Sequence, residues 1–398
     1  MSQISERINS LSESQTIAMS QKSAELKAEG RDIINLSVGQ PDFHTPEHVK
    51  DAAIKAIQEN YTSYPPVPGY KDLKEAIAKK LKEENQLDYT PEQIVVSAGA
   101  KHSLANALLA IINKGDEVIV PAPYWVSYVE QVKLAEGKNV IVKTSLDNQF
   151  KITPEQIKSA ISPRTKAIML CSPSNPTGSI YSREELKEIA EIIAKSENKI
   201  YIISDEIYEY INFEGKHQSI AQFDDIKEQV ILINGVSKGY AMTGWRIGYM
   251  AASKDIAKAC GKLQGQVTSG ACSIAQRAAL SAISGNKDFT AKMNEAFKKR
   301  RDLVLEGLSQ IKGIEKYTPQ GAFYLFPKIT YYFGKSDGNR TINNDQDLCF
   351  YLLEEANVAL VPGSAFGSPE NIRLSYAASE DELREALKRI KTALDKLA

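Results

Sequence analysis

The sequence is poor in the features that mark secreted and membrane-spanning proteins. Among 398 residues there are four cysteines, and no two of them form a Cys-x-x-Cys pair. Such scattered cysteines indicate neither a disulfide framework nor a zinc site, and they suit a reducing compartment. No apolar run approaches the roughly 20 residues that a transmembrane helix needs. Residues 1–30 also lack the apolar core of a signal peptide. We therefore expect a cytoplasmic protein without a membrane partner.

The chain also lacks an excess of charge of either sign. Its 49 basic side chains are matched by 50 acidic ones, which gives a formal net charge of −1. A balanced chain has no long-range attraction for phosphate backbones, so we expect no nucleic-acid partner. Walker A and G-x-G-x-x-G motifs are absent from the sequence, which removes the main support for P-loop and dinucleotide-binding interpretations.

One short motif matches a zinc pattern by its letters alone. His44 to His48 reads His-Thr-Pro-Glu-His, and the H-x-x-E-H site requires both imidazoles on one face of a continuous helix. We expect Thr45 to be a helix N-cap and Pro46 the first helical residue, which leaves His44 outside the helix. We expect no metal site.

The middle of the chain alternates short runs rich in valine and isoleucine with amphipathic segments. The expected strands are Ile94–Ala98, Glu117–Pro121, Val140–Thr144, Ala167–Cys171, Ile200–Ser204, Val230–Asn234 and Ile247–Ala251, and helices are expected at Ser103–Ile112, Pro154–Ala160, Ser182–Lys195 and Ile256–Leu263. This alternation predicts an α/β fold with a mostly parallel seven-stranded sheet covered by helices on both faces. We assign it to a large domain, residues 46–290.

The two ends of the chain show a less regular pattern. We expect a long helix from Ala291 to Gln310, strands at Tyr317–Pro327, Val358–Val361 and Ile372–Tyr376, and a closing helix at Glu380–Leu397. We assign residues 1–45 and 291–398 to a smaller α+β domain built from both termini.

Chemically versatile residues follow the predicted strands. In open α/β sheets, ligands bind at the carboxyl ends of the strands. There the sequence places a small-residue loop around Gly99 that leads into a helix, and then Trp125, Asn175, Asp205, Tyr208, Ser237, Lys238 and Arg246. The loop is an anion site because the first amides of a helix are free. An anion cradle, a flat aromatic ring, a carboxylate, a phenol, an amide and an amine together suit pyridoxal phosphate.

Five motifs resemble those of one enzyme family. They are Leu36–Phe43, Ser174–Gly178, Ser204–Tyr208, Ser237–Tyr249 and Arg373–Ala377. In this order, and over essentially the whole chain, they resemble the class I aminotransferases of the fold-type I pyridoxal phosphate enzymes. The resemblance implies that fold, pyridoxal phosphate as the cofactor, and small amino acids and keto acids as substrates.

The resemblance implies a role for each cofactor-site residue. Lys238 would form the Schiff base and, once released, act as the base that moves a proton between Cα and C4′. Asp205 would pair with the pyridine nitrogen, Tyr208 and Asn175 would bind the ring oxygen, and Trp125 would stack on the ring. The phosphate would be held by Gly99, Ala100 and Lys101, by Ser237 and Arg246, and by Tyr64 of a neighbouring subunit, which implies a homodimer with shared active sites. Gly235 departs from the family pattern, because many relatives carry a serine there that binds phosphate.

The substrate site follows from the same resemblance. Arg373 would bind the substrate α-carboxylate, alongside Gly39, Asn175 and Trp125. The sequence most resembles the bacterial aspartate aminotransferase branch, in which a lysine at the position of Lys101 is associated with the distal carboxylate, helped here by Ser14 and Thr16. We expect exchange of amino groups between L-aspartate and 2-oxoglutarate. A prephenate, aromatic or broad specificity, and a β-lyase reaction, remain alternatives.

Overall fold

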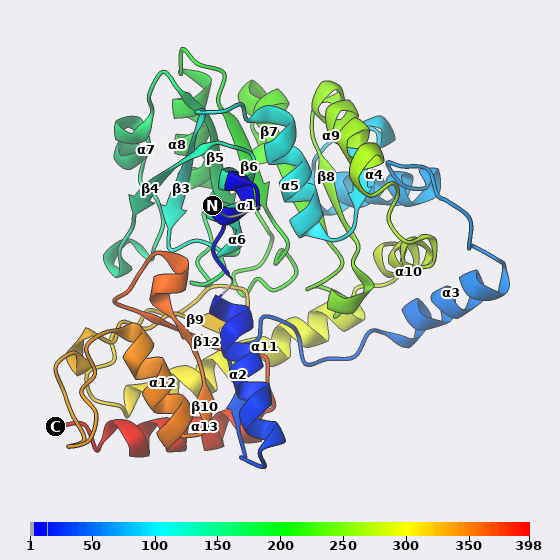
Figure 1. Cartoon of the computed structure of the whole chain (residues 1–398). Helices are drawn as coiled ribbons and strands as arrows, with labels where there is room; N and C mark the ends of the chain where they lie inside the picture. The colour runs from blue at the N-terminus through cyan, green and yellow to red at the C-terminus, as the bar shows by residue number, and fades with distance from the viewer. Residues whose placement is uncertain (1–3, 14) are drawn as a thin grey trace.

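A seven-stranded sheet forms the centre of the larger part of the molecule (Figure 1). The structure, a computed structural model, describes residues 4–13 and 15–398. The strands are β2 (Ile94–Ser97), β3 (Glu117–Ala122), β4 (Lys138–Lys143), β5 (Thr165–Cys171), β6 (Tyr201–Asp205), β7 (Val230–Gly235) and β8 (Gly248–Ala251). Their order is β2-β8-β7-β6-β5-β3-β4, and only β8 runs antiparallel to its neighbours. The mostly parallel seven-stranded sheet is thereby confirmed.

Helices cover both faces of this sheet because its strands bury side chains on both sides. On β2, Ile94 and Val96 belong to one apolar core and Val95 to another, as the period-two alternation of a strand requires. The first core is completed by α3 (Glu47–Gln58), α4 (Lys71–Asn85), α7 (Pro154–Ala160), α8 (Arg183–Ala194) and α10 (Ser273–Ser284). The second is completed by α5 (Ala100–Ile111), α6 (Ser127–Leu134) and α9 (Lys254–Val267).

Helix starts follow the local sequence. Ser182 and Glu185 form a capping box, so α8 begins at Arg183, one residue after the predicted start. The predicted cap of α3 is wrong by one residue, because Pro46 is the N-cap and Glu47 the first helical residue. The Thr45 hydroxyl donates instead to the carbonyl of Ala241. His44 still precedes the helix, so the two imidazoles do not share a helix face.

A third apolar core lies in the lower part of Figure 1, where the two ends of the chain meet. It is formed by α2 (Gln15–Ala28), β1 (Ile34–Asn35), α11 (Asp288–Ser309), β9 (Tyr324–Leu325), α12 (Asp345–Glu355), β10 (Val358–Ala359), β12 (Ile372–Ser375) and α13 (Glu380–Leu394). Strand β11 (Val361–Pro362) pairs with β12 in this part, whereas helix α1 (Glu6–Asn9) lies beside α6 of the larger part (Figure 1). The residue boundaries of the two domains stay a prediction.

Two of the strands predicted for this part are wrong in extent. Only Tyr324–Leu325 of the predicted strand Tyr317–Pro327 pairs as a strand, because the amides of Gln320 and Gly321 donate to Gly178 of the large sheet's loops and Ala322 has a φ of 55°. The predicted strand Val358–Val361 is divided, since β10 pairs with β1 and β11 pairs with β12. Among the helices of the described part of the chain, none has the length and apolar character that crossing a membrane requires.

Candidate active site

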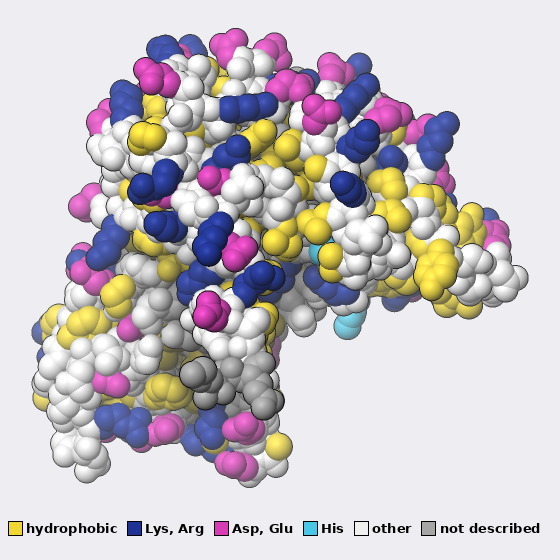
Figure 2. All heavy atoms as spheres, turned by 45° about the horizontal axis from the view of Figure 1, so that its top comes forward, with side chains coloured by type: hydrophobic (Ala, Val, Ile, Leu, Met, Phe, Trp, Pro, Cys, Tyr) yellow, Lys and Arg dark blue, Asp and Glu magenta, His cyan; other side chains and the backbone are white. Residues whose placement is uncertain are grey.

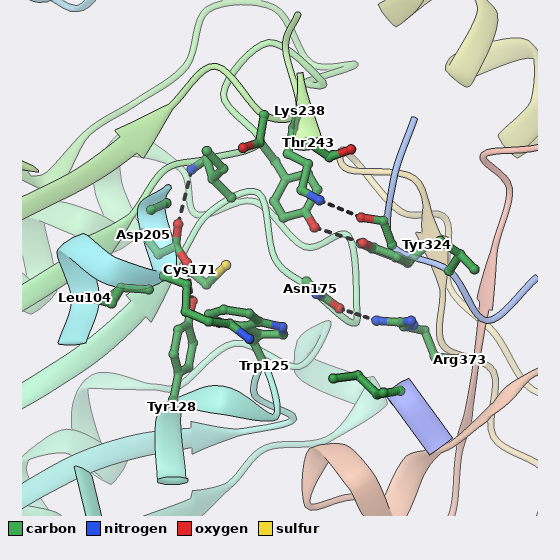
Figure 3. Close-up of a pocket in the computed structure, with 18 of the residues that line it drawn as sticks. Leu104, Trp125, Tyr128, Cys171, Asn175, Asp205, Lys238, Thr243, Tyr324 and Arg373 are labelled. Atoms are coloured by element: carbon green, nitrogen blue, oxygen red, sulfur yellow. Dashed lines mark hydrogen bonds between the residues drawn. The ribbon is translucent and has the colours of Figure 1, made fainter. Parts of the chain in front are cut away.

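A pocket of about 470 Å³ opens at the carboxyl ends of the central strands (Figure 3). It is lined by residues of the large sheet's loops and by residues from the two ends of the chain. The structure brings together eleven of the thirteen residues predicted for the site as lining residues: Gly39, Ala100, Lys101, Trp125, Asn175, Asp205, Tyr208, Ser237, Lys238, Arg246 and Arg373. Gly99, the residue before α5, does not line the pocket but lies next to the Arg246 side chain. Tyr64 lies outside the pocket, with 94% of its surface exposed.

Lys238 follows β7 and extends toward the middle of the pocket (Figure 3). Burial, followed by the positive charges of Arg373 and Arg246, lowers the pKa of its ammonium group to about 8. Its Nζ donates a hydrogen bond to the carbonyl oxygen of Gly39. A lysine with a lowered pKa is uncharged in a larger fraction of molecules near neutral pH, as a nucleophile or base must be.

Asp205 is the last residue of β6, the central strand of the sheet. Its carboxylate accepts a hydrogen bond from the Tyr128 hydroxyl at 2.7 Å and another from the Ile207 amide at 3.3 Å. Burial raises the pKa of Asp205 to about 6, and the two hydrogen bonds oppose that rise. No cation of the described residues forms an ion pair with it, so this carboxylate suits a ligand that brings its own positive charge.

The start of α5 forms an anion cradle with Arg246. Gly99 is the N-cap at a φ of 86°, and a Cβ there would lie 2.3 Å from Nη2 of Arg246. A Cβ on Gly248 would lie 2.2 Å from the Ala100 amide nitrogen. Only glycines therefore allow this close approach of backbone and guanidinium. The first amides of a helix have no intrahelical acceptor and attract anions.

Gly235, the last residue of β7, lies close to the backbone of Ile247 and Gly248. A Cβ at this position would lie 2.8 Å from the Cα of Gly248 and 2.8 Å from the carbonyl of Ile247. A serine would therefore require strands β7 and β8 to shift. Ser237, two residues further along the chain, lines the pocket.

Arg373 lies on β12, and its guanidinium points into the pocket toward Asn175 (Figure 3). Its Nη1 donates to Oδ1 of Asn175 at 3.0 Å and its Nη2 to the carbonyl of Ser37 at 2.6 Å, while its buried Nε has no partner among the residues that the structure describes. The guanidinium lies over the Tyr324 ring, 4.6 Å from its centroid. A buried guanidinium without a carboxylate suits an anionic ligand, and its planar fork matches a carboxylate.

Trp125 and Lys101 form another wall. The Lys101 ammonium lies 4.8 Å from the centre of the Trp125 ring, and Trp125 packs edge-on against Tyr128 at 5.5 Å. Helix α2 borders the same space through Ile17, Ser20 and Gln21. Of the two hydroxyl residues expected here, Ser14 lies outside the described residues and the Thr16 side chain is not among those described.

Several lining residues escaped the sequence reasoning. Tyr128, in α6, lies three residues after Trp125, and its amide donates to the Trp125 carbonyl at 2.9 Å in the turn before the helix. This short spacing of two aromatic residues is a signal that could have found Tyr128. Tyr324 had no such signal, because it follows an irregular segment. Its hydroxyl lies 2.8 Å from that of Tyr208, and burial raises the pKa of Tyr208 well above its ordinary value.

The geometry agrees with the comparisons with known proteins. Residues 31–390 match the family model described as aminotransferase class I and II, and the chain belongs to this family. It is 50% identical to an aspartate aminotransferase of Geobacillus stearothermophilus, over 97% of this chain and 98% of the relative. A probable aspartate/prephenate aminotransferase of Rickettsia bellii is 48% identical over the full length of both chains. The crystal structure of an aspartate aminotransferase from Rhizobium meliloti superposes with a TM-score of 0.96, at 42% identity and full coverage of both chains.

Membership of this family makes the chain a pyridoxal phosphate-dependent aminotransferase. The described residues fit that cofactor. Asp205 is a buried carboxylate that suits a protonated ring nitrogen, and Lys238 is an amine with a lowered pKa. Glycine at positions 99 and 248 lets Arg246 and strand β8 approach the first amides of α5 closely, and a phosphate would bind beside these groups.

Proposed function

We propose that this chain exchanges amino groups between L-aspartate and 2-oxoglutarate, giving oxaloacetate and L-glutamate in two successive half-reactions. The observation that carries the proposal is the presence of two cations, Arg373 and Lys101, among the lining residues of one pocket that also holds Lys238. Two cations suit a substrate with two carboxylates. The relatives named aspartate aminotransferase, at about 50% identity over nearly the full length, support the same assignment.

The proposed roles of the cofactor residues are those that the resemblance to class I aminotransferases implies. Pyridoxal phosphate, when bound, supplies the carbonyl that receives the amino group and a ring that takes up negative charge. Asp205 holds positive charge at the ring nitrogen, and Trp125 stacks on the ring. Tyr208 and Asn175 donate to the ring oxygen. The phosphate is held by the amides of Gly99, Ala100 and Lys101, by the side chains of Ser237 and Arg246, and by Tyr64 of a second subunit.

The proposed roles of the substrate residues concern two carboxylates and one proton. Arg373 binds the α-carboxylate in a bidentate manner, next to Asn175 and the Gly39 backbone, while Lys101 binds the distal carboxylate. This orientation leaves the Cα hydrogen within reach of Lys238. Burial lowers the pKa of its Nζ to about 8, which enlarges the uncharged fraction that can accept this proton as a general base.

Absorption spectroscopy of the holoenzyme tests the proposal. L-Aspartate alone should bleach the visible band of the lysine-bound cofactor, and 2-oxoglutarate should restore it. Lys238→Ala should abolish turnover. A band that aspartate leaves unchanged would refute the substrate, and an unchanged rate in the Lys238→Ala variant would refute the role of this lysine.

A second specificity is supported by one finding. The Rickettsia bellii relative, similar over its full length, is described as a probable aspartate/prephenate aminotransferase. Prephenate also carries two carboxylates, so the same two cations could serve it. Restoration of the visible band by prephenate in place of 2-oxoglutarate would establish this activity in addition to the first.

We also propose that the enzyme is a cytoplasmic homodimer with shared active sites. Tyr64 is 94% exposed, and the large apolar side chains of Ile54, Ile57 and Val267 are more than half exposed. Figure 2 shows hydrophobic side chains gathered on the projection that carries α3. Exposed apolar surface of this kind marks an interface. The four free cysteines suit a reducing compartment.

A further inference from the structure

The loop that carries Asp205 and Tyr208 also carries two carboxylates for which the proposed mechanism has no use. Glu206 and Glu209 are 1% and 7% exposed, and neither lines the active-site pocket. Burying a carboxylate is costly unless hydrogen bonds or cations compensate it. Both carboxylates have such compensation, and none of the residues that provide it lines the pocket.

Glu206 is enclosed by three donors. Its Oε1 accepts hydrogen bonds from the hydroxyls of Ser204, at 2.9 Å, and Ser219, at 2.6 Å. Its Oε2 lies 2.9 Å from Nε2 of His217. Ser219 and His217 belong to the irregular segment after the loop, so this carboxylate joins that segment to the end of β6.

Glu209 joins the same loop to α4. Its Oε1 accepts a hydrogen bond from the Lys80 ammonium, and its Oε2 accepts one from the Asn85 side chain at 3.1 Å. Lys80 also donates to Asn85 at 2.8 Å, which closes a triangle of three buried side chains. Both Lys80 and Asn85 are at most 5% exposed.

The backbone couples these contacts to the pocket. The Glu206 amide donates to Ile233 on β7 at 2.9 Å, and the Glu209 amide donates to the Glu206 carbonyl at 3.0 Å. Within this short loop, Asp205 and Tyr208 line the pocket while Glu206 and Glu209 are bound behind it. Any rotation of the loop that displaced the pocket pair would have to break the charged contacts of the other pair.

We propose that Glu206 and Glu209 are positioning residues that hold Asp205 and Tyr208 in the geometry that binds the cofactor ring. This inference rests on the roles of Asp205 and Tyr208 under the proposed function. Buried ion pairs add little stability compared with apolar side chains of the same volume. Their contribution is a fixed geometry, and a site for a rigid aromatic ring requires such support.

The test measures cofactor binding as well as turnover. Cofactor-free protein is titrated with pyridoxal phosphate while Trp125 and Trp245 fluorescence is followed, and kcat, KM and the melting temperature are recorded. Glu206→Gln should weaken cofactor binding about tenfold and lower kcat, with KM nearly unchanged, as removal of a supporting contact behind a binding site does. An unchanged dissociation constant and kcat would overturn the proposal for Glu206.

A triple variant removes the whole triangle without leaving a polar group unpaired. Lys80→Met with Asn85→Leu and Glu209→Leu keeps the site filled and folded, since apolar replacement of a complete buried polar group is close to neutral for stability. The cofactor should still bind more weakly, although the melting temperature is maintained. Wild-type cofactor affinity in this variant would show that the triangle is only structural and would overturn the proposal for Glu209.

Glu117→Gln is the matched control. Glu117 is also a largely buried carboxylate at a strand end, and it accepts from the Ser162 hydroxyl at 2.6 Å and from Arg164. It lies at the opposite end of the sheet from the pocket, so its loss should change stability but not cofactor affinity.

Asp205→Asn distinguishes failure of the proposed function from failure of the positioning proposal. Unchanged cofactor affinity in Asp205→Asn refutes the role of Asp205 itself, whereas weakened affinity there with wild-type affinity in the glutamate variants refutes the positioning alone.

Discussion

Arg373 combines three properties that are rarely found in one side chain: it is 3% exposed, positively charged, and without a carboxylate partner among the described residues. Arg373→Lys keeps the charge but loses the planar fork. The loss of one charged hydrogen bond, worth about 1.5–3 kcal/mol, should raise KM for both the amino acid and the keto acid by about tenfold to a hundredfold. Steady-state kinetics with each substrate measure this rise in KM. Arg277→Lys is the control, because Arg277 also makes a bidentate pair, with Asp72, outside the pocket, and KM should not change.

The lowered pKa of Lys238 predicts a pH dependence in the cofactor-free protein. An ammonium group reacts only after it loses its proton, so reactivity appears as pH rises through the pKa. Lys238 should therefore become reactive around pH 8, below the value of about 10.4 for an ordinary lysine. Reductive methylation followed by mass spectrometry measures the labelled fraction at each pH. Half-labelling of Lys238 at the pH typical of surface lysines would contradict the burial effect.

At the level of elements, the contact between β8 and the start of α5 sets the shape of the phosphate cradle. Gly248→Ala would place a Cβ 2.2 Å from the Ala100 nitrogen, and such overpacking costs about 1–3 kcal/mol. The displaced helix start should weaken binding of pyridoxal phosphate, which fluorescence titration measures. Gly244→Ala is the control, because a Cβ at Gly244 meets no atom within 4 Å. Equal cofactor affinities of the two variants would argue against the cradle.

The elements also show why the sequence predicts one part of the site and not another. Strands buried on both faces are recognisable by their composition. Asp205 is the last residue of one such strand, and Lys238 lies in the loop after another. Pairs between distant segments leave no local pattern. Asn175 and Arg373 are 198 positions apart, and the segment before Tyr324 follows a contact with Gly178 rather than its own strand propensity. Such features depend on how the sheet and the part built from the chain's ends pack together, and the hydrophobic periodicity of a single segment does not describe that packing.

At the level of the whole molecule, shared active sites predict complementation between subunits. Lys238→Ala and Tyr64→Ala should each lower activity in a homodimer. A hybrid dimer would contain one site with both defects and one with neither. Random exchange of equal amounts should therefore restore about one quarter of the wild-type sites, since half of the dimers are hybrids with one intact site each. Activity after unfolding, mixing and refolding measures this, and separately refolded variants are the control. No gain on mixing would contradict sharing of Tyr64.

The border of the pocket formed by α2 has a consequence for how new specificities could arise. Around the cofactor, glycines at 99 and 248 leave no space for even a methyl group, so substitutions there are restricted. Ile17, by contrast, is 55% exposed while it lines the same pocket, beside Ser20 and Gln21. Random libraries confined to these three positions would explore other amino-acid side chains at little risk to folding. The walls around the cofactor thus tolerate few substitutions, whereas the α2 border of the pocket tolerates many. Directed evolution of substrate specificity would begin at this border.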